Sequence, residues 1–207
     1  MNFQRLHGLT DAIFAIVMTL LVLELKVPVL EVQNNNNLWH ALTEEKAVFA
    51  SYLISFALLF IYWRAHGFIV GTLAKNLNMT LININMLFLI LIGILPFTTH
   101  LLGSYPTLQV AIAIYASNII LIGLTLFGMR QYIDRSSNIE SEQRNRTQRI
   151  NALIRVLTPV ICSAIAILLS FINPTSAFVI LLLGVFFNLP SNSADAFRKV
   201  FRIGESG

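Results

Sequence analysis

The chain has 207 residues, of which 56% are hydrophobic and 12% charged, and its mean hydropathy is +0.73. Soluble domains carry about 25% charged residues, so this composition excludes an ordinary soluble domain and indicates an all-α integral membrane protein. The net charge of +4 comes from short segments between apolar stretches, as membrane topology predicts, so it does not indicate nucleic-acid binding.

The first apolar segment, over about residues 6–27, is unusual for a helix in lipid. Only residues 12–23 separate Asp11 from Glu24, whereas a lipid-facing span needs about 20 apolar residues. A carboxylate placed toward the bilayer centre costs roughly 2.5–3.5 kcal/mol. No small-residue cleavage site follows Leu23, so a retained span is favoured over a signal peptide. We expect this helix to face protein or water, which makes it a candidate pore-lining helix.

The gaps between charged residues predict five further helices. Between Asn76 and Met129 the chain has no Lys, Arg, Asp or Glu, and the turn-forming segment 103–106 divides this stretch into two helices. A second uncharged stretch is divided at Asn173-Pro174. The predicted helices cover about 47–71, 79–102, 107–131, 152–172 and 174–190. We interpret residues 34–37, all Asn, as part of a solvated loop.

The basic residues predict the orientation of this single six-helix domain. Most Lys and Arg side chains fall on the side that holds both ends of the chain, whereas the other side has Lys26 and Lys46 among acidic residues. By the positive-inside rule, both termini are cytoplasmic in a multi-pass protein of the cell membrane. Residues 132–151 then form a cytoplasmic linker, and residues 191–207 form a cytoplasmic tail.

The apolar face of the first helix is a candidate pore surface. At 100° per residue, Ile16, Thr19, Leu20 and Leu23 fall within about 100° of one another, and Ala12 extends the same stripe. Such a stripe often only packs against neighbouring helices, but the charged ends of this helix favour a pore. Apolar rings can gate by dewetting, and Thr19 could replace part of an ion's hydration shell.

Polar residues at one depth predict a network that holds this helix. Arg5, Thr10 and Asp11 begin the first helix, His66 ends the second and Asn85 begins the third. We expect hydrogen bonds among Thr10, Asp11, His66 and Asn85, with Arg5 nearby, because unsatisfied polar groups are costly there. The alternative is separate snorkelling to the interface.

Two acidic residues lie near the predicted outer mouth. Glu24 and Glu31 could raise the local concentration of cations there. The alternative for both is ordinary solvated charge at the ends of a loop.

Several motifs resemble the transmembrane protein 175 family of potassium channels. The run Arg5-Leu6-His7-Gly8-Leu9-Thr10-Asp11 is similar to that family's Arg-x-x-x-Phe-Ser-Asp signature, although Leu9 replaces the aromatic residue and Thr10 the serine. Three more stretches are similar, namely Tyr62-Trp63-Arg64-Ala65-His66, Asn85-Met86-Leu87-Phe88-Leu89 and Leu95-Pro96-Phe97-Thr98.

This resemblance implies a potassium channel without the Thr-Val-Gly-Tyr-Gly filter, whose central pore is lined by helix one. Ile16 matches the family's apolar constriction, Thr19 its hydroxyl position and Leu23 a further apolar ring. Single-repeat members assemble as homotetramers, so the implied partners are copies of this chain, the lipid bilayer and permeant monovalent cations. No cofactor is implied, no metal site beyond transient potassium is expected, and protons are a second candidate permeant ion.

Two other classes of function are weighed against the channel. A secondary transporter or proton-conducting membrane protein usually has ionisable groups near the midplane and repeated halves with broken helices, which the later helices lack. A membrane enzyme needs a base and a nucleophile or metal within reach. We place His100 near the outer face and Cys162 within the fifth helix, with no carboxylate in the membrane between them, so we do not expect an enzyme.

Overall fold

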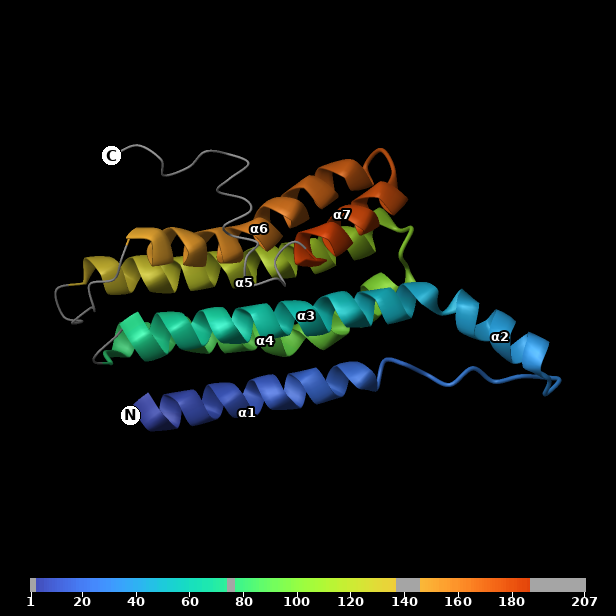
Figure 1. Cartoon of the computed structure of the whole chain (residues 1–207), viewed down its shortest axis with the longest axis horizontal. Helices are drawn as coiled ribbons and strands as arrows, with labels where there is room; N and C mark the ends of the chain where they lie inside the picture. Colours follow the sequence, from blue (N-terminus) through green and yellow to red (C-terminus); the bar gives the residue numbers. More distant parts are fainter. Residues whose placement is uncertain (1–2, 74–76, 137–145, 187–207) are drawn as a thin grey trace.

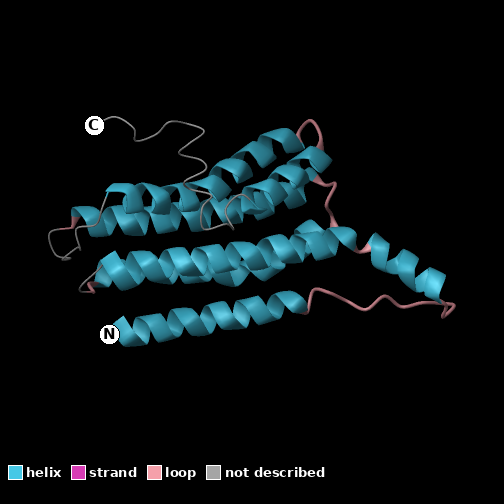
Figure 2. Cartoon of the chain, viewed as in Figure 1, coloured by secondary structure: helices cyan, strands magenta, loops and turns pink. Residues whose placement is uncertain are grey.

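A computed structural model describes residues 3–73, 77–136 and 146–186 of the chain. Throughout these ranges the regular structure is helical (Figure 2). The helices are α1 (Phe3–Val22), α2 (Asn35–Glu44), α3 (Lys46–Phe68), α4 (Met79–Ser104), α5 (Gln109–Arg135), α6 (Arg146–Ser170) and α7 (Pro174–Phe186), with a π-helical turn η1 (Ile69–Leu73) that extends α3.

The long helices lie side by side in a bundle, with α1 at one edge (Figure 1). Helices α3, α4 and α5 pack successively, α6 packs on α5, and α7 packs on α6. The main neighbours of α1 are α3 and α4. Among the described residues, no helix packs against the other side of α1, so its two faces have different surroundings.

Four helices are long and apolar enough to cross a membrane: Gln4–Val22, Lys46–Gly71, Met79–Ser104 and Gln109–Arg135. The apolar segments of the last two helices, Val156–Ser170 and Pro174–Val185, are shorter than the roughly 20 residues that a perpendicular span needs. The prediction of an all-helical membrane protein with several spans is confirmed. Whether all six predicted spans cross the bilayer stays a prediction.

Two of the predicted boundaries differ from the structure at the outer end, which we define as the end of the bundle that holds Val22. Helix α1 ends there and not near residue 27, because the amides of Leu23, Glu24 and Leu25 bond to carbonyls three residues back and tighten the chain into a turn. The expectation of a loop at residues 34–37 was wrong. Asn34 caps α2 by accepting a hydrogen bond of 2.7 Å from the amide of Asn37, so the other asparagines begin a helix.

The segment predicted to be a cytoplasmic linker is shorter in the structure than the charge pattern indicated. Helix α5 continues to Arg135 and α6 already begins at Arg146, so much of the interval 132–151 is helical. Charged residues mark where the apolar layer stops, but they do not stop a helix, because Arg, Gln and Glu are good helix formers. Residues 191–207, predicted as a tail, lie outside the described residues.

Buried hydroxyl groups connect the three central helices, and the sequence analysis did not find them. Ser55 of α3 lies 3.0 Å from the hydroxyl of Tyr115 of α5 and accepts a 2.8 Å hydrogen bond from Thr99 of α4. All three side chains are buried. Between helices in lipid, where there is little hydrophobic driving force, such bonds and close packing hold the bundle together. This core gives α1 a firm surface to pack on.

Candidate functional site

One face of α1 packs into its own subunit. The buried residues recur every three or four positions, which places them on one stripe of the helix. They are Leu6, Thr10, Phe14, Val17 and Leu21. Phe14 contacts the ring of Phe88 on α4, with 5.9 Å between the ring centroids. The stripe therefore fixes which side of α1 is turned toward α3 and α4.

The opposite face of α1 is exposed, and it contains every residue of the predicted pore stripe. Ile16, Leu20 and Leu23 are 57%, 43% and 68% exposed. Ala12 and Thr19 lie exposed on the same side. Lipid can cover apolar side chains in a membrane protein, but this stripe lies between the carboxylates of Asp11 and Glu24, which are costly to place in hydrocarbon. The residues that the sequence analysis predicted to face a pore are therefore left exposed in the single chain.

Thr19 is the polar group within this stripe, and its hydroxyl orientation follows from two short contacts. Its Oγ1 lies 2.8 Å from the carbonyl oxygen of Ile16 and 3.0 Å from that of Ala15, so the hydroxyl proton is donated back to the helix. A hydroxyl has one proton to donate but two lone pairs. The lone pairs of Thr19 are left to face outward, where they could accept from water or contact a cation.

At the Asp11 end of the stripe, α1 is tied to α3 by an indole. Trp63 Nε1 donates a 2.8 Å hydrogen bond to Oδ1 of Asp11. Both residues are exposed in the single chain, and the carboxylate makes this a charge-assisted bond. Because Asp11 lies on the flank between the buried and exposed faces, the bond restrains the rotation of α1 about its own axis.

His66 and Asn85 form a separate, buried pair beside this contact. Nε2 of His66 lies 2.6 Å from Oδ1 of Asn85, and both residues are about 1% exposed. The imidazole also stacks on Phe88, with ring centroids 5.1 Å apart, and meets the edge of His7 at 6.5 Å. Since Phe88 contacts Phe14, this stack connects α3 and α4 with the buried side of α1.

The predicted single network is thus two separate contacts in the structure. We expected Asp11 to bond to His66 and Asn85, whereas in the structure Asp11 accepts its hydrogen bond from Trp63. Thr10 is buried on the packed stripe, and its hydroxyl oxygen has no hydrogen-bond partner. Arg5 lies on the exposed side of α1. The sequence analysis assigned Trp63 no partner. Its indole N–H, at the same depth as Asp11, is a donor that could have suggested this hydrogen bond.

At the outer end, Glu24 pairs with His100 of α4. The Glu24 carboxylate and Nδ1 of His100 are in ion-pair contact, and the Glu24 side chain is 24% exposed. The Nδ1 atom of His100 is buried at this contact. Two acidic residues were predicted to lie near the outer mouth. Glu24 instead connects the end of α1 to α4, whereas Glu31 is exposed.

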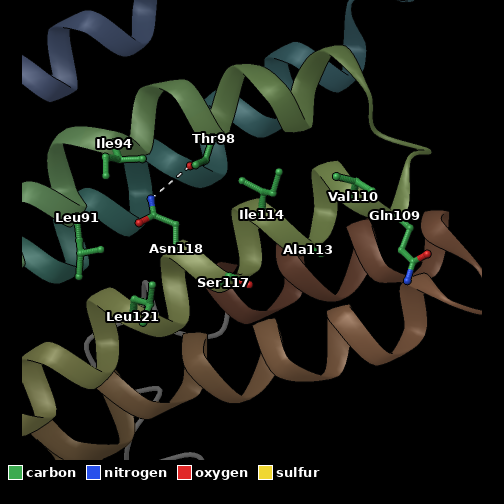
Figure 3. A pocket seen from close by; sticks show the side chains of 10 residues that line it. All are labelled: Leu91, Ile94, Thr98, Gln109, Val110, Ala113, Ile114, Ser117, Asn118 and Leu121. Atoms are coloured by element: carbon green, nitrogen blue, oxygen red, sulfur yellow. Dashed lines mark hydrogen bonds between the residues drawn. The ribbon is translucent and has the colours of Figure 1, made fainter.

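A groove of about 520 Å³ lies between α4 and α5, apart from the exposed stripe of α1. Its walls are mostly apolar, and Asn118 donates a 3.4 Å hydrogen bond to Thr98 across it (Figure 3). None of the predicted site residues lines this groove. The exposed stripe of α1, with the Asp11 contact before it and the Glu24 contact after it, is therefore the better candidate for the functional site.

Comparisons with known proteins agree with this arrangement. Residues 5–96, which contain α1, α3 and most of α4, match the family described as "Endosomal/lysosomal potassium channel TMEM175". A potassium channel of Streptomyces collinus is 28% identical over 139 residues, which cover 65% of this chain and 66% of that protein. A potassium channel of Chamaesiphon minutus is 28% identical over 195 residues, which cover 91% of this chain and 95% of that protein.

A solved structure has the same fold. The crystal structure of a lysosomal potassium-selective channel TMEM175 homolog from Chamaesiphon minutus superimposes with a TM-score of 0.73 at 25% identity, covering 89% of this chain and 95% of that one. The bundle and the exposed, doubly anchored α1 thus define a multi-helix membrane protein with a channel-type fold. Within that class, residues 5–96 resemble the TMEM175 family, and the chain is similar over most of its length to a potassium channel of Chamaesiphon minutus.

The buried His66–Asn85 pair gives a direct test of how α1 is supported. We expect Asn85→Ala to leave Nε2 of His66 buried without a partner, which costs about 1–3 kcal/mol. For a chain of this size each kcal/mol lowers the melting temperature by roughly 2–4 °C. The measurement is the thermal stability of the purified protein in detergent. Asn83→Ala is the matched control, because Asn83 is exposed two residues earlier on the same helix; equal losses in both variants would contradict the structural role of the pair.

Proposed function

We propose that this protein is a potassium channel whose central pore is lined by the exposed faces of α1 helices from four copies of the chain. The single observation that carries the proposal is the α1 stripe. The apolar residues of this stripe lie uncovered on the side of α1 that faces away from its own bundle. A carboxylate lies near each end of the stripe, Asp11 before it and Glu24 after it. The relatives are named potassium channels, and residues 5–96 match a family of that description, which supports potassium as the permeant ion.

The assembly follows from the number of helices that a pore requires. One helix cannot enclose a conduit, so several subunits must contribute α1 around a shared axis, and closed cyclic symmetry is the usual solution for identical subunits. The position of α1 at the edge of the bundle suits this arrangement, since copies can meet along α1 while their bundles stay outside (Figure 1). The homotetramer comes from the resemblance to single-repeat family members.

In the proposed pore, Ile16 and Leu23 form apolar rings and Thr19 a ring of hydroxyls between them. Narrow apolar rings resist wetting, so they can set the barrier to conduction. The hydroxyl protons of Thr19 are committed to the helix backbone, so its oxygens are oriented to replace water around a dehydrating cation. Glu31 would contribute negative potential near the outer mouth.

The proposed function is tested by reconstituting the protein in liposomes with opposed potassium and sodium gradients. A potassium channel gives a reversal potential near the potassium equilibrium value, because potassium carries most of the current. The measurement is a current–voltage curve in planar bilayers or patched liposomes. A reversal potential that follows the proton gradient would favour the proton-conducting alternative, and slow saturable exchange without single-channel steps would favour a transporter.

Replacing Ile16 by Asn should increase the current several-fold, because a polar amide helps water to enter the apolar ring. A barrier lowered by about 1.4 kcal/mol corresponds to a tenfold rise in rate. The readout is single-channel conductance in symmetric potassium. Val22→Asn is the control, since Val22 is 47% exposed but lies about 120° round the helix from Ile16. An unchanged conductance in Ile16→Asn would remove this residue from the pore.

Replacing Thr19 by Val should reduce the discrimination of potassium over sodium, because the shape is kept while the oxygen is lost. The permeability ratio from bi-ionic reversal potentials is then expected to fall toward one. Thr125→Val is a suitable control, since Thr125 on α5 makes a similar intrahelical hydrogen bond of 2.7 Å to Leu121. The role of Thr19 is refuted if both variants retain the original permeability ratio.

A further inference from the structure

The segment between α1 and α3 extends beyond the outer end of the bundle. From Leu23 the chain runs away from the long helices, and α2 then returns to α3 (Figure 1). We call residues 23–44 the outer hairpin. Glu44, Glu45 and Lys46 lie at its base, and such a charged group is expected at or outside the membrane surface. A ten-residue helix such as α2 is about 15 Å long, so its first turns lie well beyond that level.

Helix α2 has an apolar face that its own chain leaves largely uncovered. Leu38, Trp39 and Leu42 fall within about 100° of one another on the helix, and they are 40%, 71% and 37% exposed. None of the ten residues of α2 is buried. The opposite face is polar and includes the exposed pair of His40 and Glu44, 3.3 Å apart.

The segment that leads to α2 also has exposed apolar side chains. Val27, Val29 and Val32 are 86%, 98% and 61% exposed. A tie holds the hairpin in shape, since the side-chain amide of Asn37 donates a 3.0 Å hydrogen bond to the carbonyl of Val32. With Leu23, the hairpin therefore presents seven exposed large apolar side chains.

The direction of α2 argues against lipid as the cover. An amphipathic helix that binds the membrane surface lies in the plane of the interface, with its apolar face about 5–10 Å deep. Helix α2 instead projects outward beyond the end of the bundle (Figure 1). Leu38 and Trp39 lie in its N-terminal half, which is the half away from α3 and the membrane level.

The hairpin is also continuous with the exposed stripe of α1. It begins at Leu23, which is 68% exposed and is the last residue of that stripe. Copies of the chain that meet along α1 must therefore bring their hairpins together just beyond its outer end. A second copy is the one partner that this continuity supplies.

We propose that the outer hairpin docks on the outer hairpin of a neighbouring copy of this chain, through Leu38, Trp39 and Leu42. This inference rests on the proposed function insofar as that function brings copies together along α1. The contacts form a collar above the outer end of the α1 stripe. The collar ties the outer ends of the α1 helices together, in addition to the contact of Glu24 with His100 within each subunit.

Cysteine cross-linking in membranes tests the docking surface. The background variant is Cys162→Ala, which removes the chain's single cysteine. Leu38→Cys is then compared with His40→Cys, which places the thiol on the opposite, polar face of the same helix. With a short bis-maleimide added to intact membranes, we expect covalent dimers of full-length chain at least fivefold more abundant for Leu38→Cys. Equal or lower yield at position 38 overturns the proposal.

Two further measurements separate the possible causes of failure. An environment-sensitive fluorophore on Leu38→Cys should not be quenched by brominated lipid, and strong quenching would show that lipid covers the face and overturn the docking proposal. Potassium flux is measured on the same preparations. Flux without selective cross-linking overturns the hairpin contact but leaves the channel intact, whereas selective cross-linking without potassium flux supports the contact and contradicts the proposed function.

Discussion

The structure depends on the fact that α1 can be covered by its own chain on one side only. Its buried stripe packs on α3 and α4, and the remaining surface carries Ile16, Leu20 and Leu23 without a partner in the subunit. Lipid could cover apolar side chains, but the uncharged part of α1 is short and has Asp11 before it and Glu24 after it. A surface with this combination is better suited to a conduit shared by several copies than to hydrocarbon.

Two polar contacts of α1 flank its exposed stripe, and this placement has a physical reason. In a membrane, apolar packing alone hardly distinguishes one rotation of a helix from another, because lipid tails are as apolar as Leu. Directional contacts do distinguish them. Asp11 with Trp63 near the middle of α1 and Glu24 with His100 just beyond its end define both the rotation and the height of the helix. The stretch between them presents apolar residues and one hydroxyl.

The buried stack of His66, Phe88 and Phe14 shows how the support for α1 extends into the core. His66 is held by Asn85, stacks on Phe88, and Phe88 contacts Phe14 of α1. Deeper in the bundle, Ser55, Thr99 and Tyr115 connect α3, α4 and α5. Such support behind α1 suits the proposed pore, because loosely held rings of side chains could not discriminate between ions of similar size.

The sequence by itself determined that this is a membrane protein and which residues of α1 are exposed. Composition shows whether a chain is adapted to lipid or to water, and the helical period shows which residues share one side of a helix. The family motifs were also legible, since they are local. Only the tertiary structure decided that Asp11 meets Trp63 and not His66, that Glu24 turns to His100, and that hydroxyls join α3, α4 and α5. Those contacts depend on the depth and rotation at which separate helices pack, which no local pattern specifies. Helix α2 was missed because a run of asparagines resembles a loop until its first member is seen to cap the others.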